Sequence, residues 1–344
     1  MKILILKPSS LGDIVQALPV LRLIKRHRPD SEIYWWIDAR FAPLLEGDPD
    51  LTGVIRFERH RWASPLHWPE IIHRTRWART QVFDWVIDLQ CLARSGMFAW
   101  LVNGKFTIGL DEPREGARTL YDVVVPRPSY YTHVVDWYLN VLPRLRVPVH
   151  SNFAWFPENK PVAQAVRKKW QTTDSRWVIL QPGARWLNKR WPAENYAALV
   201  RQLAATDPEL RFAVLGGADE QRLGETIVCA APNRCLDLTG KLSLPGMVEW
   251  IRLATAMVSN DTGPMHVAAA LKIPLVAIFG PTEPRRNGPY GQLENVIQTF
   301  LPCVPCRKPV CRNHEPLACL HTIPVSTVVA RVEKQLRQPV PAAP

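Results

Sequence analysis

Short apolar runs alternate with longer amphipathic segments along the chain, and this alternation restricts the fold more than any other feature. In the first half, the apolar runs are typical of buried strands and the segments between them of helices. Strands are predicted at residues 2–6, 32–37, 54–57 and 85–89, and helices at 11–28 and 69–79. Strands and helices in alternation predict a parallel sheet with helices on both faces.

The second half of the chain repeats the scheme. Strands are predicted at residues 177–181, 211–215, 257–259 and 274–279, with helices at 193–205, 220–230, 244–256 and 264–271. A length of 344 residues favours two domains, and four prolines between residues 143 and 161 indicate the junction. We expect an α/β protein of two doubly wound parallel-sheet domains, residues 1–155 and 156–325, with a disordered tail at 339–344.

The net charge of +12 favours an anionic partner, which leaves nucleic acid, acidic lipid and phosphorylated substrates open. The start of the chain lacks the long apolar region of a signal peptide, and no run approaches the ~18 apolar residues of a membrane span. An intracellular protein is therefore expected. Its seven cysteines are then expected to be free thiols or metal ligands rather than disulfides.

The first polar motif is KPSSLGDIV at residues 7–15, which follows the first predicted strand. Asp13 in this motif has two readings. It can stabilise the N-terminus of the next helix, although Ser9 and Ser10 are equally able to cap that helix. Alternatively, its carboxylate takes a proton from a hydroxyl nucleophile.

The second motif, VSNDTGPMH at residues 258–266, joins a predicted strand to a predicted helix. Asp261, Thr262 and Gly263 form the turn, and His266 follows in the first turn of the helix. Backbone N–H groups at a helix N-terminus bind phosphate. A helix cap needs only Asp261 or Thr262, so the added glycine and histidine favour a diphosphate site.

Two further loops follow predicted strands of the second half. In QPGARWLNKRWP, residues 181–192, Gly183 permits close backbone approach and Lys189 offers a cation to a phosphate, although a plain surface lysine is the commoner case. In LGGADE, residues 215–220, Glu220 is placed to hold a ribose. This loop is not a dinucleotide fingerprint, because G-x-G-x-x-G is absent.

Together these segments resemble the ADP-heptose:lipopolysaccharide heptosyltransferases, members of glycosyltransferase family 9. The resemblance runs from LKPSSLGDIVQALPVL through SNDTGPMHVAAAL to IFGPTEPRRNGPYG, nearly the whole chain. It implies the GT-B fold, two Rossmann-like domains facing across a cleft. It also implies a final helix at 326–338 that packs back on the first domain.

The resemblance implies roles for the motif residues. Asp13 maps to the proposed base, and Lys189 to a lysine that contacts the donor near its sugar and diphosphate. Contacts to the ADP-heptose donor are implied for Ser10, Gly12, Gly183, Arg185, Lys189, Glu220, Leu242, Asp261, Thr262, Gly263 and His266. Leu242 is expected to pack against adenine, Glu220 to hold the ribose, and Arg185 to contact phosphate where relatives carry hydroxyl residues.

An arginine-rich segment lies between residues 56 and 79. It contains six arginines but only two glutamates, and tryptophans lie among them. One reading is a solvated basic helix. The other is a surface for an anionic glycolipid acceptor near an anionic membrane. The residues expected on the acceptor side, most of them through the resemblance, are Arg61, Arg94, Arg114, Arg118 and His133.

Two groups of potential metal ligands remain. Cys303, Cys306, Cys311 and Cys319 have spacing that suits a structural four-thiolate site for zinc or iron, although reduced thiols in a loop are slightly favoured. Asp48 and Asp50 resemble the D-x-D metal motif of other transferases but sit in a Gly/Pro turn, which indicates a loop. The transfer chemistry itself is expected to need no metal or other cofactor.

We therefore expect an inverting glycosyltransferase that moves heptose from ADP-heptose to a lipopolysaccharide inner-core acceptor. It is expected in the cytoplasm, peripheral at the inner face of the inner membrane. Another nucleotide sugar, or a protein or O-antigen acceptor, remains an alternative. A basic nucleic-acid-binding protein is a remote one, because no nucleic-acid-binding motif is recognisable and no such partner is expected.

Overall fold

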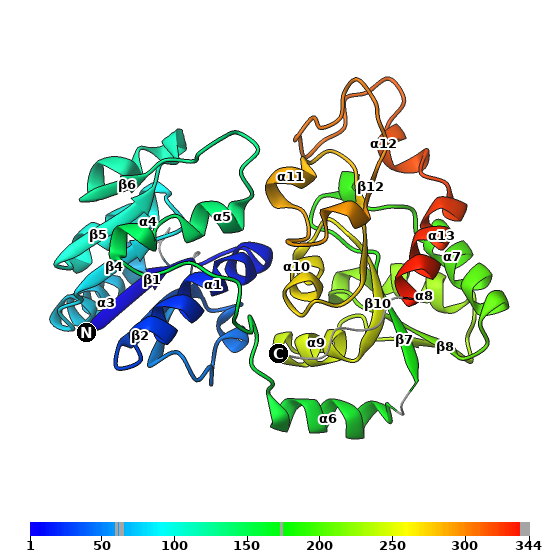
Figure 1. The fold of residues 1–344 in the computed structure, drawn as a ribbon, viewed down its shortest axis with the longest axis horizontal. Helices are drawn as coiled ribbons and strands as arrows, with labels where there is room; N and C mark the ends of the chain where they lie inside the picture. Colours follow the sequence, from blue (N-terminus) through cyan, green and yellow to red (C-terminus); the bar gives the residue numbers. More distant parts are fainter. Residues whose placement is uncertain (59–60, 62–64, 173–174, 338–344) are drawn as a thin grey trace. The chain divides into compact units, whose positions relative to one another are not determined.

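The computed structural model describes residues 1–58, 61, 65–172 and 175–337. The chain forms two compact units, Met1–Pro157 and Glu158–Pro344, each built on its own six-stranded sheet (Figure 1). Every described strand pairing is parallel, and helices flank both sheets. The predicted α/β fold class is confirmed.

The first unit has the strand order β3-β2-β1-β4-β5-β6. Strand β1 (Lys2–Leu6) lies in the middle, between β2 and β4, and its apolar run is buried from Ile3 onward. The other strands are β2 (Glu32–Asp38), β3 (Gly53–Phe57), β4 (Trp85–Asp88), β5 (Phe106–Leu110) and β6 (Val123–Val125). The helices are α1 (Leu11–His27), α3 (Trp68–Thr80), α4 (Ala93–Val102) and α5 (Val134–Leu139).

The second unit has the order β12-β11-β10-β7-β8-β9. Its strands are β7 (Arg176–Gln181), β8 (Leu210–Val214), β9 (Cys235–Asp237), β10 (Ala254–Asn260), β11 (Leu275–Phe279) and β12 (Val296–Gln298). Its helices are α6 (Lys160–Trp170), α7 (Ala193–Thr206), α8 (Gln221–Val228), α9 (Leu244–Arg252), α10 (Gly263–Ala270), α11 (Pro284–Asn287), α12 (Ala318–His321) and α13 (Val325–Leu336).

The predicted helix at 244–256 is too long. Helix α9 ends at Arg252, and β10 already begins at Ala254. Apolar residues with good helix propensity continue past the helix end, so local pattern could not separate the two elements. Pairing of β10 with β7 on one side and β11 on the other decides in favour of the strand.

Helix α13 packs on α7, β10 and β11 of its own unit, and its Val328 and Val332 belong to that unit's core. The expected packing of this final helix on the first unit stays a prediction. The expected disordered tail at 339–344 lies outside the described residues. None of the helices in the described ranges is both long enough and apolar enough to span a membrane.

A buried ion pair holds the segment that follows β2 against helix α1. The Arg22 side chain on α1 is 5% exposed and donates to Asp48, to Asp50 at 2.7 Å and, through Nε, to the Trp155 carbonyl at 3.0 Å. Asp48 and Asp50 lie in a turn, as predicted, and both carboxylates bind this guanidinium.

Replacing Arg22 with Met is expected to lower the free energy of unfolding by roughly 3 kcal/mol or more, because Asp48 is left buried without its counter-charge. Urea denaturation measures the loss. The matched control is Arg28→Met at the exposed end of α1, which should change stability by less than about 0.5 kcal/mol. Equal stability of the two variants would contradict a structural role for this pair.

Candidate active site

The loops of the second unit that carry the predicted donor residues all leave the same edge of its sheet. Because β7, β8, β9, β10 and β11 are parallel, their carboxyl ends lie together. Chain connections run to opposite sides from the central pair β7 and β10, which makes this edge a topological switch point. Ligands of doubly wound sheets bind at such points.

Lys189 and Asp261 meet at this edge. The Lys189 Nζ lies 2.6 Å from Oδ2 of Asp261 and 4.9 Å from the centre of the Trp186 ring. The same Oδ2 accepts a hydrogen bond from the Thr282 hydroxyl at 2.6 Å. Thr282 follows β11 and was missed in the sequence, where a single threonine after a Gly-Pro turn carries no signal of its own.

The first turn of α10 follows Asp261 directly. Thr262 is the N-cap, and within the described residues its side chain makes no capping hydrogen bond. The Thr262 side chain therefore does not satisfy the N–H groups at this helix N-terminus. His266 is buried one turn into the helix. Such an end attracts an anion through its N–H groups and its dipole.

Asn260, at the end of β10, binds both ends of the loop after β7 and the start of α7. Its Nδ2 donates to the Pro182 carbonyl at 2.6 Å, and its Oδ1 accepts from the Trp191 N–H and the Tyr196 hydroxyl, both at 3.2 Å. Asn260 is fully buried. It therefore holds the loop after β7, which carries Lys189, in register with Asp261. The sequence analysis did not single out this residue.

Glu220 occupies a second position on the same edge. Its carboxylate accepts from the Gly217 N–H at 3.0 Å and from Arg190 at 3.1 Å, while Arg190 also donates to the Ala184 carbonyl at 2.8 Å. A Cβ on Gly183 would come within 2.1 Å of this carboxylate, so a larger residue there would force the Glu220 side chain to move. Arg190 is a further residue that the sequence analysis missed.

The remaining donor candidates are more exposed. Arg185 is exposed in the loop after β7, and within the described part of the chain it has no ion-pair partner. Leu242 is half-buried in the loop between β9 and α9. This loop lies against residues 216–218, because the Gly240 N–H donates to the Gly216 carbonyl at 2.9 Å.

In the first unit, Asp13 lies in the first turn of α1, at the switch point between β1 and β4. Its Oδ2 accepts from the Ser10 N–H at 2.9 Å and from the Ser10 hydroxyl at 2.6 Å. Gly12 is buried beside it. Asp13 therefore caps its own helix, and these two bonds also hold its carboxylate in one orientation.

A buried lysine anchors the loop that leads from β1 to Asp13. Lys7 donates to the Leu89 carbonyl at 2.9 Å and lies 4.9 Å from the Tyr138 ring centre. Burial by itself lowers the pKa of Lys7, but Tyr138 and Asp13 outweigh burial and raise it above its ordinary value. Lys7 thus ties the end of β1 to the segment after β4.

The predicted acceptor residues each have partners within the first unit. Arg114 pairs with Glu112, and this bond raises the pKa of Arg114, with a smaller contribution from the Asp13 carboxylate. Arg118 pairs with Asp111 at 3.2 Å, and Arg94 lies over the Phe57 ring. His133 is buried and caps α5, where its Nδ1 accepts from the Val135 N–H.

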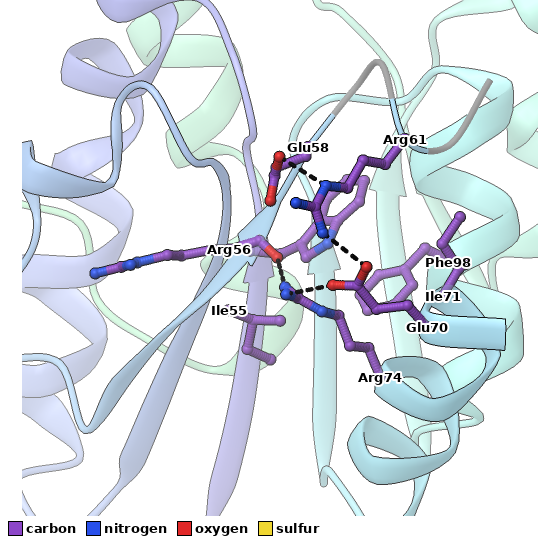
Figure 2. Close-up of a pocket in the computed structure, with 9 residues that line it drawn as sticks. Ile55, Arg56, Glu58, Arg61, Glu70, Ile71, Arg74 and Phe98 are labelled. Atoms are coloured by element: carbon purple, nitrogen blue, oxygen red, sulfur yellow. Dashed lines mark hydrogen bonds and ion pairs between the residues drawn. The ribbon is translucent and has the colours of Figure 1, made fainter. Parts of the chain in front are cut away.

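Arg61 lines a separate pocket between β3, α3 and α4 (Figure 2). Its guanidinium pairs with Glu58 at 3.0 Å and with Glu70 at 2.8 Å, and Glu70 also pairs with Arg74. Figure 2 shows the Arg56 side chain directed away from these groups, while its carbonyl accepts from Arg74. Arg61 is thus neutralised by two carboxylates.

The alternative of a four-thiolate metal site is not supported. Across the described residues, which include all four cysteines, no group of three or more Cys, His, Asp or Glu side chains is arranged to hold a metal ion. The cysteines still influence one another: burial first, and then Cys311, Cys303 and Cys306, raise the pKa of Cys319 to about 11. The spacing of the four cysteines in the sequence suits a metal site, but their side chains are not arranged to hold a metal ion.

Cys311 and Cys319 are expected to differ in reactivity. A hydrogen bond from the Leu317 N–H lowers the pKa of Cys311, whereas Cys319 stays protonated far above neutral pH. At pH 8, iodoacetamide should therefore alkylate Cys311 well before Cys319, as measured by peptide mass spectrometry. Alkylation of Cys319 at the same rate or faster would contradict this arrangement.

Comparison with known proteins identifies the family. The pattern described as glycosyltransferase family 9 (heptosyltransferase) matches residues 73–316. Lipopolysaccharide heptosyltransferase 1 of Pseudomonas aeruginosa is 29% identical over 324 residues, which cover 90% of this chain and 87% of that protein. Lipopolysaccharide heptosyltransferase 2 of Escherichia coli is 26% identical, with 87% and 88% covered.

Solved structures share the fold. The E. coli ADP-heptose lipopolysaccharide heptosyltransferase II superposes with a TM-score of 0.79 at 24% identity over 98% of each chain. An E. coli heptosyltransferase solved with ADP-2-deoxy-2-fluoro heptose gives 0.74 at 24% identity, over 97% of this chain and 99% of that one. The predicted two-domain fold is confirmed. Because the family pattern covers most of its length, the chain belongs to glycosyltransferase family 9, the heptosyltransferases.

Proposed function

We propose that the protein transfers a heptose from ADP-heptose to an inner-core lipopolysaccharide acceptor, with inversion at the anomeric carbon. The observation that carries the donor assignment is the cluster of Lys189, Asp261 and Thr282 beside the N-terminus of α10. The named heptosyltransferase relatives, and the one solved with an ADP-heptose analogue, support the choice of nucleotide sugar.

The second unit supplies what a departing diphosphate needs. Charge develops on the diphosphate as the sugar leaves, and fixed N–H groups and cations stabilise that charge. We assign this role to the N-terminus of α10, His266 and Lys189. The Asp261 carboxylate would repel the diphosphate if it were bare, but the Lys189 ammonium and the Thr282 hydroxyl compensate its charge. The step requires no metal ion.

The other residues proposed to contact the donor lie at the same edge of the sheet. Glu220, fixed by Arg190 and Gly217, offers its carboxylate to the ribose hydroxyls. Leu242 offers an apolar surface to adenine, and Arg185 an exposed cation to phosphate. Gly183 keeps the loop backbone close to Glu220.

Asp13 is assigned as the general base. It accepts the proton of the acceptor hydroxyl while that oxygen attacks the anomeric carbon, so that one displacement forms the new bond and breaks the old one. The two bonds from Ser10 orient its carboxylate. Capping and proton abstraction are compatible, because a carboxylate has more lone pairs than two bonds use.

The acceptor is proposed to be an anionic glycolipid, approached from the cytoplasm at the inner membrane. Arg94, Arg114, Arg118 and His133 are assigned to its phosphate and carboxylate groups. Arg61 belongs to this set only if the acceptor displaces it from Glu58 and Glu70, since both carboxylates now hold its guanidinium.

The variant Asp13→Asn tests the base. Its amide oxygen still accepts the bonds from Ser10, so α1 stays capped, but the amide cannot take a proton. We expect kcat to fall by about 100-fold to 10,000-fold with ADP affinity unchanged. Turnover near that of the wild type, measured by mass spectrometry of the product, would remove Asp13 from this role.

The variant Lys189→Gln tests the donor site. Loss of a charged hydrogen bond should weaken ADP binding by roughly 10-fold to 100-fold in calorimetry, since Asp261 then faces the diphosphate uncompensated. Adding Asp261→Asn should recover part of the loss. The control is Lys168→Gln on the exposed side of α6, which should bind ADP as the wild type does. Unchanged affinity in Lys189→Gln would refute the assignment.

A further inference from the structure

The segment between β12 and α12 is long and irregular. It comprises residues 299–317 (orange in Figure 1) and contains Cys303, Cys306 and Cys311, so we call it the cysteine-rich segment. All of its residues are described, and none of them lies in a helix or a strand. Most of its side chains are exposed, so little apolar packing is available to hold it in place.

One hydrogen bond joins this segment to the loop that carries Lys189. Asn188, the residue before Lys189, donates from Nδ2 to the Lys308 carbonyl at 2.7 Å. Asn188 lies in a short helical turn, Leu187–Lys189, and is 5% exposed. Because both residues belong to one short turn, a bond that holds the Asn188 side chain also restricts the backbone from which the Lys189 side chain extends.

A second hydrogen bond joins the segment to the turn that carries Thr282. The Arg307 N–H donates to the Pro281 carbonyl at 2.7 Å, one residue before Thr282. The two loops also touch each other, since a Cβ on Gly280 would lie 3.2 Å from the Asn188 carbonyl oxygen. Adjacent residues of the cysteine-rich segment therefore bind both loops that supply partners to the donor-site carboxylate.

The Asn188 side chain is not an arrangement for stability alone. Its Oδ1 is buried and, among the described residues, has no hydrogen-bond partner. A buried oxygen without a partner costs free energy, and an apolar side chain of similar size avoids that cost. Lys308 is exposed, so water replaces the amide at its carbonyl if Asn188 is changed. What the amide contributes is therefore the direction of one bond.

We propose that Asn188 is a positioning residue for Lys189, and that it acts by anchoring the lysine loop to the cysteine-rich segment. The Lys189 side chain is long and flexible, and a fixed backbone beneath it lowers the entropy that it loses when its ammonium meets a phosphate. The inference rests on the proposed donor site. It implies that nucleotide binding and order in the cysteine-rich segment depend on each other.

The variant Asn188→Leu tests this role by ADP calorimetry. Leucine has a similar volume but cannot donate to Lys308, so ADP should bind roughly threefold to tenfold more weakly. AMP, which lacks the phosphate proposed to meet Lys189, should bind the variant as it binds the wild type. The variant should unfold at the same urea concentration as the wild type or at a higher one. A lower unfolding concentration together with weaker binding of both nucleotides would show a purely structural residue.

A double-mutant cycle separates positioning from a general disturbance of the site. In the Lys189→Gln background, Asn188→Leu should change ADP affinity by less than about twofold, because the ammonium that it positions is absent. The control Asn233→Ala, in the exposed connection before β9 at the opposite edge of the sheet, should bind ADP as the wild type does. If Lys189→Gln leaves ADP affinity unchanged, the proposed donor site fails. If only Asn188→Leu does so, this inference fails alone.

Hydrogen exchange measures the same coupling from the side of the cysteine-rich segment. Saturating ADP should slow amide exchange in the wild-type peptide that contains Arg307 and Lys308, and this slowing should be lost in Asn188→Leu. Exchange that ADP leaves unchanged in the wild type, or slows equally in both proteins, would overturn the proposal.

Discussion

The ion pair between Lys189 and Asp261 is the interaction on which the donor site depends. It joins the loop after β7 to the turn before α10, across the central strand pair of the second sheet. Thr282, in the loop after β11, donates a hydrogen bond to the same carboxylate oxygen of Asp261. One carboxylate therefore sets the positions of the groups proposed to meet the diphosphate, and its own charge is compensated before any ligand arrives.

Asn260 makes this arrangement rigid. Its fully buried side chain bonds both ends of the loop that carries Lys189 and the Tyr196 hydroxyl on α7, so this loop cannot shift without breaking bonds that water does not replace. The first unit uses the same principle with other residues. There Lys7 ties β1 to the segment after β4, and Ser10 orients Asp13. In both units the polar groups stand where parallel strands end.

Much of this organisation was predictable because it is local. The strands at residues 2–6 and 177–181 are continuous apolar runs, and the glycines and acids after them indicate loops at one edge of a sheet. The partners Thr282, Arg190 and Asn260 were not predictable, because their roles depend on loops distant in sequence. The predicted end of α9 was wrong for a similar reason, because the pairing of β10 with strands on both sides overrides helix propensity. The cysteine spacing left a metal site open, because spacing alone does not orient thiols, and only the structure counts against that site.

The central claim is that the paired phosphates of the donor lie between Lys189 and the N-terminus of α10. A crystal structure of the protein with ADP tests it most directly. The account predicts the β-phosphate within hydrogen-bond distance of the Lys189 ammonium and of the backbone N–H groups at the start of α10. Nucleotide density at any other edge of the second sheet, or phosphates turned away from that helix, would contradict it.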